Sequence, residues 1–278
     1  MKKIIILAIS LIAMTSVFAQ TSKPSVAIDE LTYNSNIGTN WVTDLRNQII
    51  AGFTGTGRVD VVDIRSIAGL PSAEADRHVH LKSANVGSLI KCHFNSLTGT
   101  SEVKDGKTSY NYKANYTLTL IDLNTGATKE TKTYEALGFS TESSAASIND
   151  AMSDVPRNIR NFVDECFKLA GVVKSLDKIH PKKGVETMYV TIGTNEGIQV
   201  GQPLDIFVET DVAGEIITKQ IKGTVKIKEV VSPTLSLASV SGKEAQAEIL
   251  TYFENGKTIY VVSRPKTSFL DAMDSFLK

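Results

Sequence analysis

The fold is decided by the stretch YNYKANYTLTL, residues 110–120. Its apolar positions alternate with polar ones and are Tyr110, Tyr112, Ala114, Tyr116, Leu118 and Leu120. Because successive side chains of a strand point to opposite faces, a period of two predicts a long strand with one buried face. The same alternation is typical of a transmembrane barrel strand. The neighbouring arm, Thr98–Lys107, is polar and short, which favours a strand of a soluble sheet over a pore-forming hairpin.

Two further strands flank this stretch. Before it, residues 87–96 (GSLIKCHFNS) form an apolar, strand-like run, and residues 104–107 (KDGK) are a hairpin turn signal. After it, residues 124–126 (NTG) turn the chain into a strand at 128–137. The sequence therefore predicts three consecutive strands joined by hairpins.

Helical spacing of apolar residues occurs on both sides of these strands. Residues 38–53 carry one apolar stripe and lie between strands expected at 23–31 and 58–63. Residues 72–82 are ambiguous and compatible with a short helix. A long amphipathic helix is expected from Ile148 to Ala170, in which Pro156 predicts a kink or a break after Asp154, and Gly171 is expected to close it.

From residue 172 the pattern changes to short strands and tight turns, which predicts a small β-barrel or sandwich. The predicted fold class is α+β, with an N-terminal mixed α/β sandwich domain at 20–171 and a smaller C-terminal β-barrel or sandwich-like domain at 172–265. The tail, 266–278, has apolar residues at helical spacing. It indicates an amphipathic helix that either packs on its own domain or docks on a partner. In the second domain we expect a helix at 244–253 and strands at 172–179, 187–192, 203–208, 216–231, 233–240 and 258–263.

The first nineteen residues, MKKIIILAISLIAMTSVFA, have the pattern of a secretory signal peptide. Two lysines precede an apolar run, and Val17-Phe18-Ala19 offers a cleavage site with small residues. No cysteine lies near the cut, so the lipoprotein route is not expected. We therefore expect an exported periplasmic protein, with association to the outer membrane as a further option.

Composition narrows the classes of function. The 30 basic residues balance the 30 acidic ones, whereas a nucleic-acid-binding protein usually has a basic excess. The hydrophobic content of 42% is enough for a packed core. After residue 19 no apolar run approaches the roughly 18 residues that a membrane-spanning helix needs. We expect no nucleic-acid partner and no integral membrane span.

The two cysteines, Cys92 and Cys166, allow two interpretations. An exported protein can form a disulfide between them. Both also lie in apolar patterns, Cys92 in a strand-like run and Cys166 on the apolar face of a helix, where a free cysteine behaves as a small buried hydrophobe. The second interpretation is favoured, because sequence alone cannot establish the close approach that a disulfide requires.

One histidine pair raises the question of a metal. If residues 78–80 formed a strand, His78 and His80 would share a face and could bind zinc together with Cys92 or His93. If the segment is helical, residues two apart do not face each other. The interpretation as ordinary surface is favoured, and we predict no catalytic, cofactor-binding or metal-binding residue and no cofactor.

The first domain carries an ordered set of motifs, VAIDEL, WVTDLRNQIIAGF, GRVDVVDIRSI, GSLIKCHF, YTLTLIDLNTGATKETKTYEA and AASINDAMSDVPRNIRNFVDECFKL. This set resembles the periplasmic α/β domain shared by CsgG-type curli secretion proteins, LpoB-type activators of penicillin-binding proteins and the TolB N-terminal domain. The second domain carries YVTIGTNEGIQVGQPLDIFVE and KGTVKIKEVVSPTLSLASV, with Gly193, Gly197 and Gly201 evenly spaced. It resembles the C-terminal β domain of FlgT-like flagellar proteins.

The resemblance implies a non-enzymatic exported cell-envelope protein, an adaptor or assembly factor for a secretion, motility or wall-synthesis machine. Its partners would be cell-envelope proteins, and it could also form a homo-oligomer. A first alternative is a subunit of a CsgG-like outer-membrane export complex; the missing lipidated cysteine and the lack of clear pore-forming hairpins count against it. A second alternative is a metal-dependent envelope enzyme built on His78, His80 and Cys92. The family has no shared catalytic residues that could be transferred to this chain.

Overall fold

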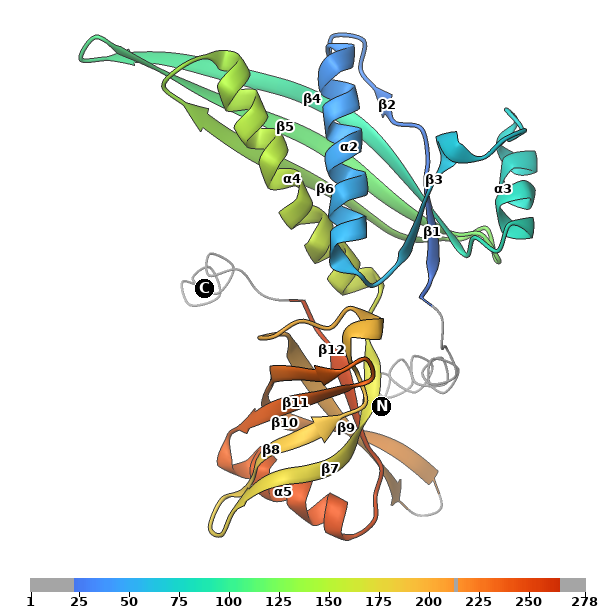
Figure 1. Ribbon diagram of the computed structural model, residues 1–278, viewed down its shortest axis with the longest axis vertical. Coiled ribbons are helices and arrows are strands. Elements are labelled where there is room, and N and C mark those ends of the chain that lie inside the picture. The colour runs from blue at the N-terminus through green and yellow to red at the C-terminus, as the bar shows by residue number, and fades with distance from the viewer. Residues whose placement is uncertain (1–22, 213–214, 266–278) are drawn as a thin grey trace. The chain divides into compact units, whose positions relative to one another are not determined.

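The computed structural model describes residues 23–212 and 215–265, so the expected signal peptide and tail helix lie outside the described residues. The chain divides into two compact units, Pro24–Cys166 and a second unit whose described part begins at Phe167. The first is a sheet with helices, and the second is a closed barrel (Figure 1). The predicted α+β class is confirmed.

The sheet of the first unit has the strand order β3-β1-β4-β5-β6, with β2 paired to β4. β1 is parallel to both β3 and β4, because a helix connects β1 to β3 and another connects β3 to β4. β4, β5 and β6 are antiparallel and follow one another through hairpins, as expected. The strands are β1 (Ser25–Ile28), β2 (Thr32–Tyr33), β3 (Asp60–Asp63), β4 (Ser88–Lys104), β5 (Lys107–Asp122) and β6 (Thr128–Ser140).

The alternation that predicted β5 also describes its burial. Ala114, Tyr116 and Leu118 are fully buried, and the residues between them are half-buried. The predicted hairpin turn joins β4 to β5, with Asp105 and Gly106 both at positive φ (51° and 72°). Two successive residues of positive φ are typical of the turns that match the twist of paired strands. Both strands extend farther toward this turn than the apolar pattern indicated.

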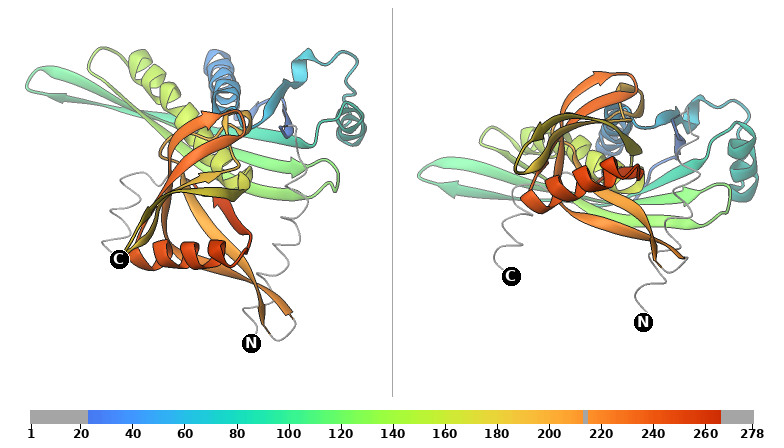
Figure 2. Two further views of the ribbon diagram at one scale, coloured as in Figure 1. Left: turned by 60° about the horizontal axis from the view of Figure 1, so that its bottom comes forward. Right: turned by 90° about the horizontal axis from the view of Figure 1, so that it is seen from below.

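Two helices, α2 (Thr39–Thr56) and α4 (Ser144–Cys166), cover one face of the sheet (Figures 1 and 2). Their apolar stripes meet through Phe53 and Phe162, whose ring centroids are 6.1 Å apart. Phe162 also packs edge-on against Tyr134 of the sheet, at 6.4 Å. Among the described helices, none has the length and apolar character needed to cross a membrane.

The structure corrects two expectations about α4. Of the kink or break expected at Pro156, the break is absent, since the helix continues through Pro156 to Cys166. Val155 and Ile159 are fully buried on either side of the proline, and this packing offsets the lost backbone hydrogen bond. Gly171 does not close the helix, because it lies in a strand of the second unit. A Cβ added to Gly171 would lie 2.6 Å from Cγ1 of Ile192, so a larger residue would not fit there.

The ambiguous segment at 72–82 forms a helix, α3 (Glu74–Ser83), on the opposite face of the sheet from α2. Leu81 of α3 packs in one cluster with Ala27 and Leu89, which lie opposite each other in β1 and β4. Ile28, one residue on, points to the other face. Asp63 lies opposite Ile28 and is contacted by Arg46 of α2.

The second unit is a closed antiparallel barrel with the strand order β10-β11-β8-β7-β12-β9. Of the two predicted forms, barrel and sandwich, the structure has the barrel. Inward-facing residues such as Val185, Met188 and Val190 fill its interior and are fully buried. The elements are β7 (Ala170–His180), β8 (Gly184–Val190), β9 (Pro203–Val212), β10 (Glu215–Ser232), β11 (Leu235–Ser241), α5 (Lys243–Glu254) and β12 (Ile259–Ser263).

Candidate functional site

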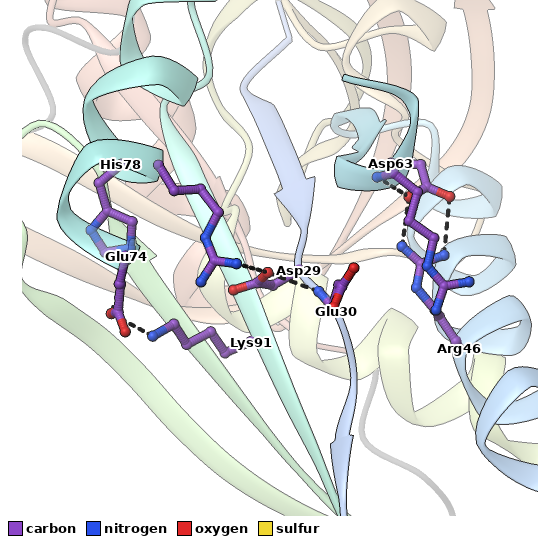
Figure 3. A network of polar contacts seen from close by, with 9 residues as sticks. Asp29, Glu30, Arg46, Asp63, Glu74, His78 and Lys91 are labelled. Atoms are coloured by element: carbon purple, nitrogen blue, oxygen red, sulfur yellow. Dashed lines mark hydrogen bonds and ion pairs between the residues drawn. The ribbon is translucent and has the colours of Figure 1, made fainter. Parts of the chain in front are cut away.

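Charged side chains gather where β1 ends beside β4 and α3 (Figure 3). Nη1 of Arg77 lies 3.5 Å from Oδ1 of the buried Asp29. Nζ of Lys91 lies 2.5 Å from Oε1 of Glu74, and Nε2 of His78 lies 3.7 Å from the same oxygen. We call these five residues the strand-end cluster. It joins the sheet to α3 through opposite charges.

A second ion pair lies on the other face, between α2 and the end of β3. Arg46 donates two hydrogen bonds to the carboxylate of Asp63, of 3.0 and 2.6 Å, and only 3% of the Arg46 side chain is exposed. Asp63 also accepts a hydrogen bond from the backbone N–H of Arg65 and thereby caps the following 3₁₀ turn, Ile64–Ser66. This pair fixes α2 on the sheet.

The electrostatics of these sites favour fixed charges. The hydrogen bonds from Arg46 hold the pKa of Asp63 below its usual range, and those from Lys91 do the same for the pKa of Glu74. Both carboxylates are therefore anions at neutral pH. General acid–base catalysis uses groups whose pKa lies near the working pH. Asp63 and Glu74 are suited to holding elements together rather than to transferring protons.

The structure does not bring together the residues of the metal-site alternative. His78 and His80 lie two residues apart on α3, where residues at this spacing do not face each other. Cys92 and His93 are neighbours in β4 and point to opposite faces; Cys92 is buried and His93 contacts Thr32 at 2.8 Å. No group of three potential ligands forms within residues 23–212 and 215–265. The metal-enzyme alternative thus has no site in this part of the chain.

Cys92 and Cys166 are free thiols in the structure, as the favoured interpretation expected. Burial raises the pKa of Cys166 to about 12, and it raises the pKa of Cys92 as well. Because the thiolate is the reactive form, we expect both thiols to react slowly at neutral pH.

A different surface appears at the far end of the sheet, near the β4–β5 turn. Leu137 and Phe139 of β6 are 61% and 57% exposed and lie on the same face, two residues apart. Their partners in β5 are Lys113 and Asn111, respectively. We call these four residues the distal surface. Two large apolar side chains here are surrounded by polar ones.

Next to the distal surface this face is polar, and its threonines hydrogen-bond to one another, whereas farther along it carries the apolar Leu89 and Ile121 beneath α3. Thr117 and Thr133 contact each other across β5 and β6 at 2.9 Å, and Thr131 donates to Thr119 at 3.3 Å. Such cross-strand hydroxyl pairs are common on solvated sheet faces. Leu137 and Phe139 therefore stand out from the exposed part of this face, which is otherwise polar here.

Side chains of α4 form hydrogen bonds with backbone groups of β6 beside the distal surface. The N–H of Phe139 donates to Asp150 at 2.9 Å, and Asn158 donates to the carbonyl of Glu135 at 3.1 Å. An added strand needs free backbone groups at an edge. A partner would therefore contact this end of β6 through side chains rather than by extending the sheet.

Sequence reasoning missed two features of this unit. Leu137 and Phe139 fall in or just after a predicted strand, and the sequence analysis did not assign them to either face. The alternation with Ala136 and Gly138, which are buried, was a usable signal, since it places them on the uncovered face. The buried ion pair between Arg58 and Asp164 was also missed, because its partners are distant in sequence.

No family model matches the sequence, and no curated protein matches it. Solved structures that are similar cover about half of the chain. A hypothetical protein from Chlamydia trachomatis is 11% identical, covers 51% of this chain and 96% of its own, and has a TM-score of 0.38. A lipoprotein from Neisseria meningitidis is 12% identical over 49% of this chain and 98% of its own, with a TM-score of 0.36.

The C-terminal domain of LpoB from Salmonella enterica is also similar, at 11% identity over 45% of this chain and 90% of its own, with a TM-score of 0.28. LpoB belongs to the resemblance that the sequence motifs indicated. No comparison assigns the chain to the CsgG-type or FlgT-like proteins. At these identities and TM-scores, none of these likenesses carries an argument about function.

Proposed function

We propose that this chain is a non-enzymatic exported protein of the cell envelope that binds another envelope protein through the distal surface. The observation that carries the proposal is the exposure of Leu137 and Phe139 side by side on a part of the sheet face whose neighbouring side chains are polar. The first nineteen residues support export, because they have the charge and apolar pattern of a signal peptide.

The energetics favour a contact at this position. Burial of a large apolar side chain contributes about 1.5–3 kcal/mol, so covering both residues would supply a central part of a binding energy. Interfaces are typically organised as an apolar centre with a polar rim. Asn111 and the ion pair between Lys113 and Glu135, at 3.1 Å, lie beside the two apolar side chains and would form such a rim.

The test is cross-linking in intact cells, followed by fractionation and identification of the captured proteins. The double variant Leu137→Ser and Phe139→Ser removes the apolar centre without touching a buried residue. Ile216→Ser is the matched control, because Ile216 is 75% exposed and lies in the other unit. We expect a discrete envelope partner that is lost with the double variant and retained with the control.

Three other results have distinct meanings. A partner that is captured equally by the wild type, the double variant and the control would overturn the role of the distal surface. Absence of any envelope partner would contradict the proposal as a whole. Capture of only further copies of this chain in the membrane fraction would favour the alternative of an export-complex subunit.

A further inference from the structure

The helix α3 is anchored much more weakly than the other helices of its unit. Leu81 is the only buried residue among its ten, and Val79 is 69% exposed. By contrast, α2 and α4 bury seven and nine residues, respectively. Elements with few buried apolar contacts are the ones that open locally without global unfolding.

The remaining attachment of α3 is electrostatic. Glu74 pairs with Lys91 of β4, and their side chains are 56% and 33% exposed. Arg77 pairs with Asp29, at 3.5 Å. Exposed ion pairs such as Glu74–Lys91 contribute little net stability, and salt screens them further. The Arg77–Asp29 pair is more buried and is screened less, so Glu74–Lys91 is the contact of α3 that ionic strength weakens most.

Two polar atoms of α3 favour its release. Nε of Arg77 and Nε2 of His78 are buried and, within the described residues, make no hydrogen bond, although Nε2 of His78 lies 3.7 Å from Oε1 of Glu74. A buried polar atom that lacks a partner carries a desolvation cost. Detachment of α3 would let water bind both atoms and would remove that cost.

The surface of the sheet beneath α3, which we call the floor, is apolar and continuous with the core of the first unit. Leu81 packs there in a cluster that includes Ala27, Val86, Leu89 and Ile121, all of which are buried. Next to this floor lies the carboxylate of Asp29, which is 6% exposed while Arg77 covers it. If α3 moved away, an apolar floor with one carboxylate at its border would become accessible.

We propose that α3 is a lid, which detaches from the sheet as a unit and uncovers the floor and Asp29 while the rest of the unit stays folded. This inference is independent of the distal surface, because the residues that carry it belong to α3, β1 and the first part of β4. The opening is controlled by ion pairs, so it responds to ionic strength.

The test is hydrogen–deuterium exchange of the full chain at neutral pH, in about 0.05 M and about 0.5 M salt. We expect peptides of α3 to exchange at least about 10-fold faster than those of α2 and α4. High salt should raise the exchange rate of α3 several-fold and leave α4 unchanged. Equal protection of the three helices, or an α3 rate that does not respond to salt, would overturn the proposal.

A pair of variants makes the test specific. Lys91→Met removes the charge that holds Glu74 and keeps most of the apolar stem, so α3 exchange should rise while α4 exchange stays constant. Lys132→Met is the control, since Lys132 forms a comparable ion pair with Glu165 at the end of α4. A rise of α3 exchange in the control but not in Lys91→Met would contradict a lid held by the strand-end cluster.

Discussion

Nη1 of Arg58 lies 2.9 Å from Oδ1 of Asp164, and only 2% and 4% of the two side chains are exposed. Arg58 lies in the short segment between α2 and β3, and Asp164 lies in the last turn of α4. Burial lowers the pKa of Arg58, and the charge of Asp164 opposes that effect. Asp164 therefore compensates a cation that is withdrawn from water where the end of α4 meets the chain that follows α2.

Asp164→Asn should destabilise the first unit strongly, by about 3 kcal/mol, because it leaves a buried guanidinium without this counter-charge. Urea unfolding followed by the fluorescence of Trp41 measures the change. Trp41 is the only tryptophan and lies in α2, so it reports on this unit.

Asp154→Asn is the control for this prediction. It removes the Asp154–Arg157 pair, in which 71% of the arginine side chain is exposed, and should cost less than about 0.5 kcal/mol. Similar losses in the two variants would mean that the Arg58–Asp164 pair contributes no more than a surface contact.

Gly52→Ala should destabilise the first unit even though alanine is the better helix former. A Cβ at Gly52 would lie 2.7 Å from Cβ of Ile159, so α2 and α4 would have to move apart. Overpacking of this kind costs about 1–3 kcal/mol, which exceeds the gain of about 1 kcal/mol in helix propensity.

Gly55→Ala provides the matched comparison within the same helix. Gly55 is exposed and a Cβ there meets nothing within 4 Å, so this variant should be stabilised by up to about 1 kcal/mol. The same urea titration measures both variants. If both changed stability in the same direction, close packing of α2 on α4 at Gly52 would not be the cause.

The ion pair of Asp63 predicts a dependence of stability on pH. Its folded-state pKa is lowered by Arg46, so the stabilisation is present above the unfolded pKa of about 3.9 and is lost as the pH falls through the folded value. Because the Asp63 side chain is 36% exposed, we expect only about 1 kcal/mol between wild type and Asp63→Asn at pH 7.

This difference should shrink below about pH 4, where the wild-type carboxyl also becomes neutral. Stability curves for both proteins between pH 2 and 7 test the prediction, with Asp60→Asn at an exposed position of β3 as the control. A difference that persisted undiminished at the lowest pH would show that Asp63 does not act through its charge.

The two cysteines should be unreactive in the folded protein. Burial raises the pKa of both thiols, so Ellman's reagent at pH 7–8 should label them slowly before unfolding and label both rapidly in urea. The measurement uses protein purified without reductant from the exported fraction. Two thiols that stay unlabelled in urea until a reductant is added would reveal a disulfide instead.

Much of the fold could be predicted because polar and apolar side chains alternate along the chain with the period of the strand or helix that they form. The alternation in residues 110–120 predicted β5, the Asp105-Gly106 turn predicted the hairpin, and the apolar stripe from Trp41 to Phe53 predicted α2. The exceptions lie where packing overrides a local signal. Pro156 stays helical because α4 is buried around it, and Gly171 serves a close contact in β7 rather than a helix end.

The candidate sites were less predictable, because they depend on which distant residues meet. His78, His80, Cys92 and His93 looked like a set along the chain, and the helical geometry of α3 and the alternation of β4 separate them. The strand-end cluster contains His78 and Lys91, but its acidic members are Asp29 and Glu74, which no motif connected to them.

The sequence by itself determined the type and order of most elements, the change from an α/β unit to a unit of short strands, and the expectation of export, since each depends on composition or on a repeat over a few residues. Only the tertiary structure decided that Arg58 neutralises Asp164, that Leu137 and Phe139 remain exposed, and that α3 is held mainly by ion pairs. These relations depend on the register of strands and the packing of helices. Both bring together residues separated by tens of positions, a distance over which a local pattern carries no information.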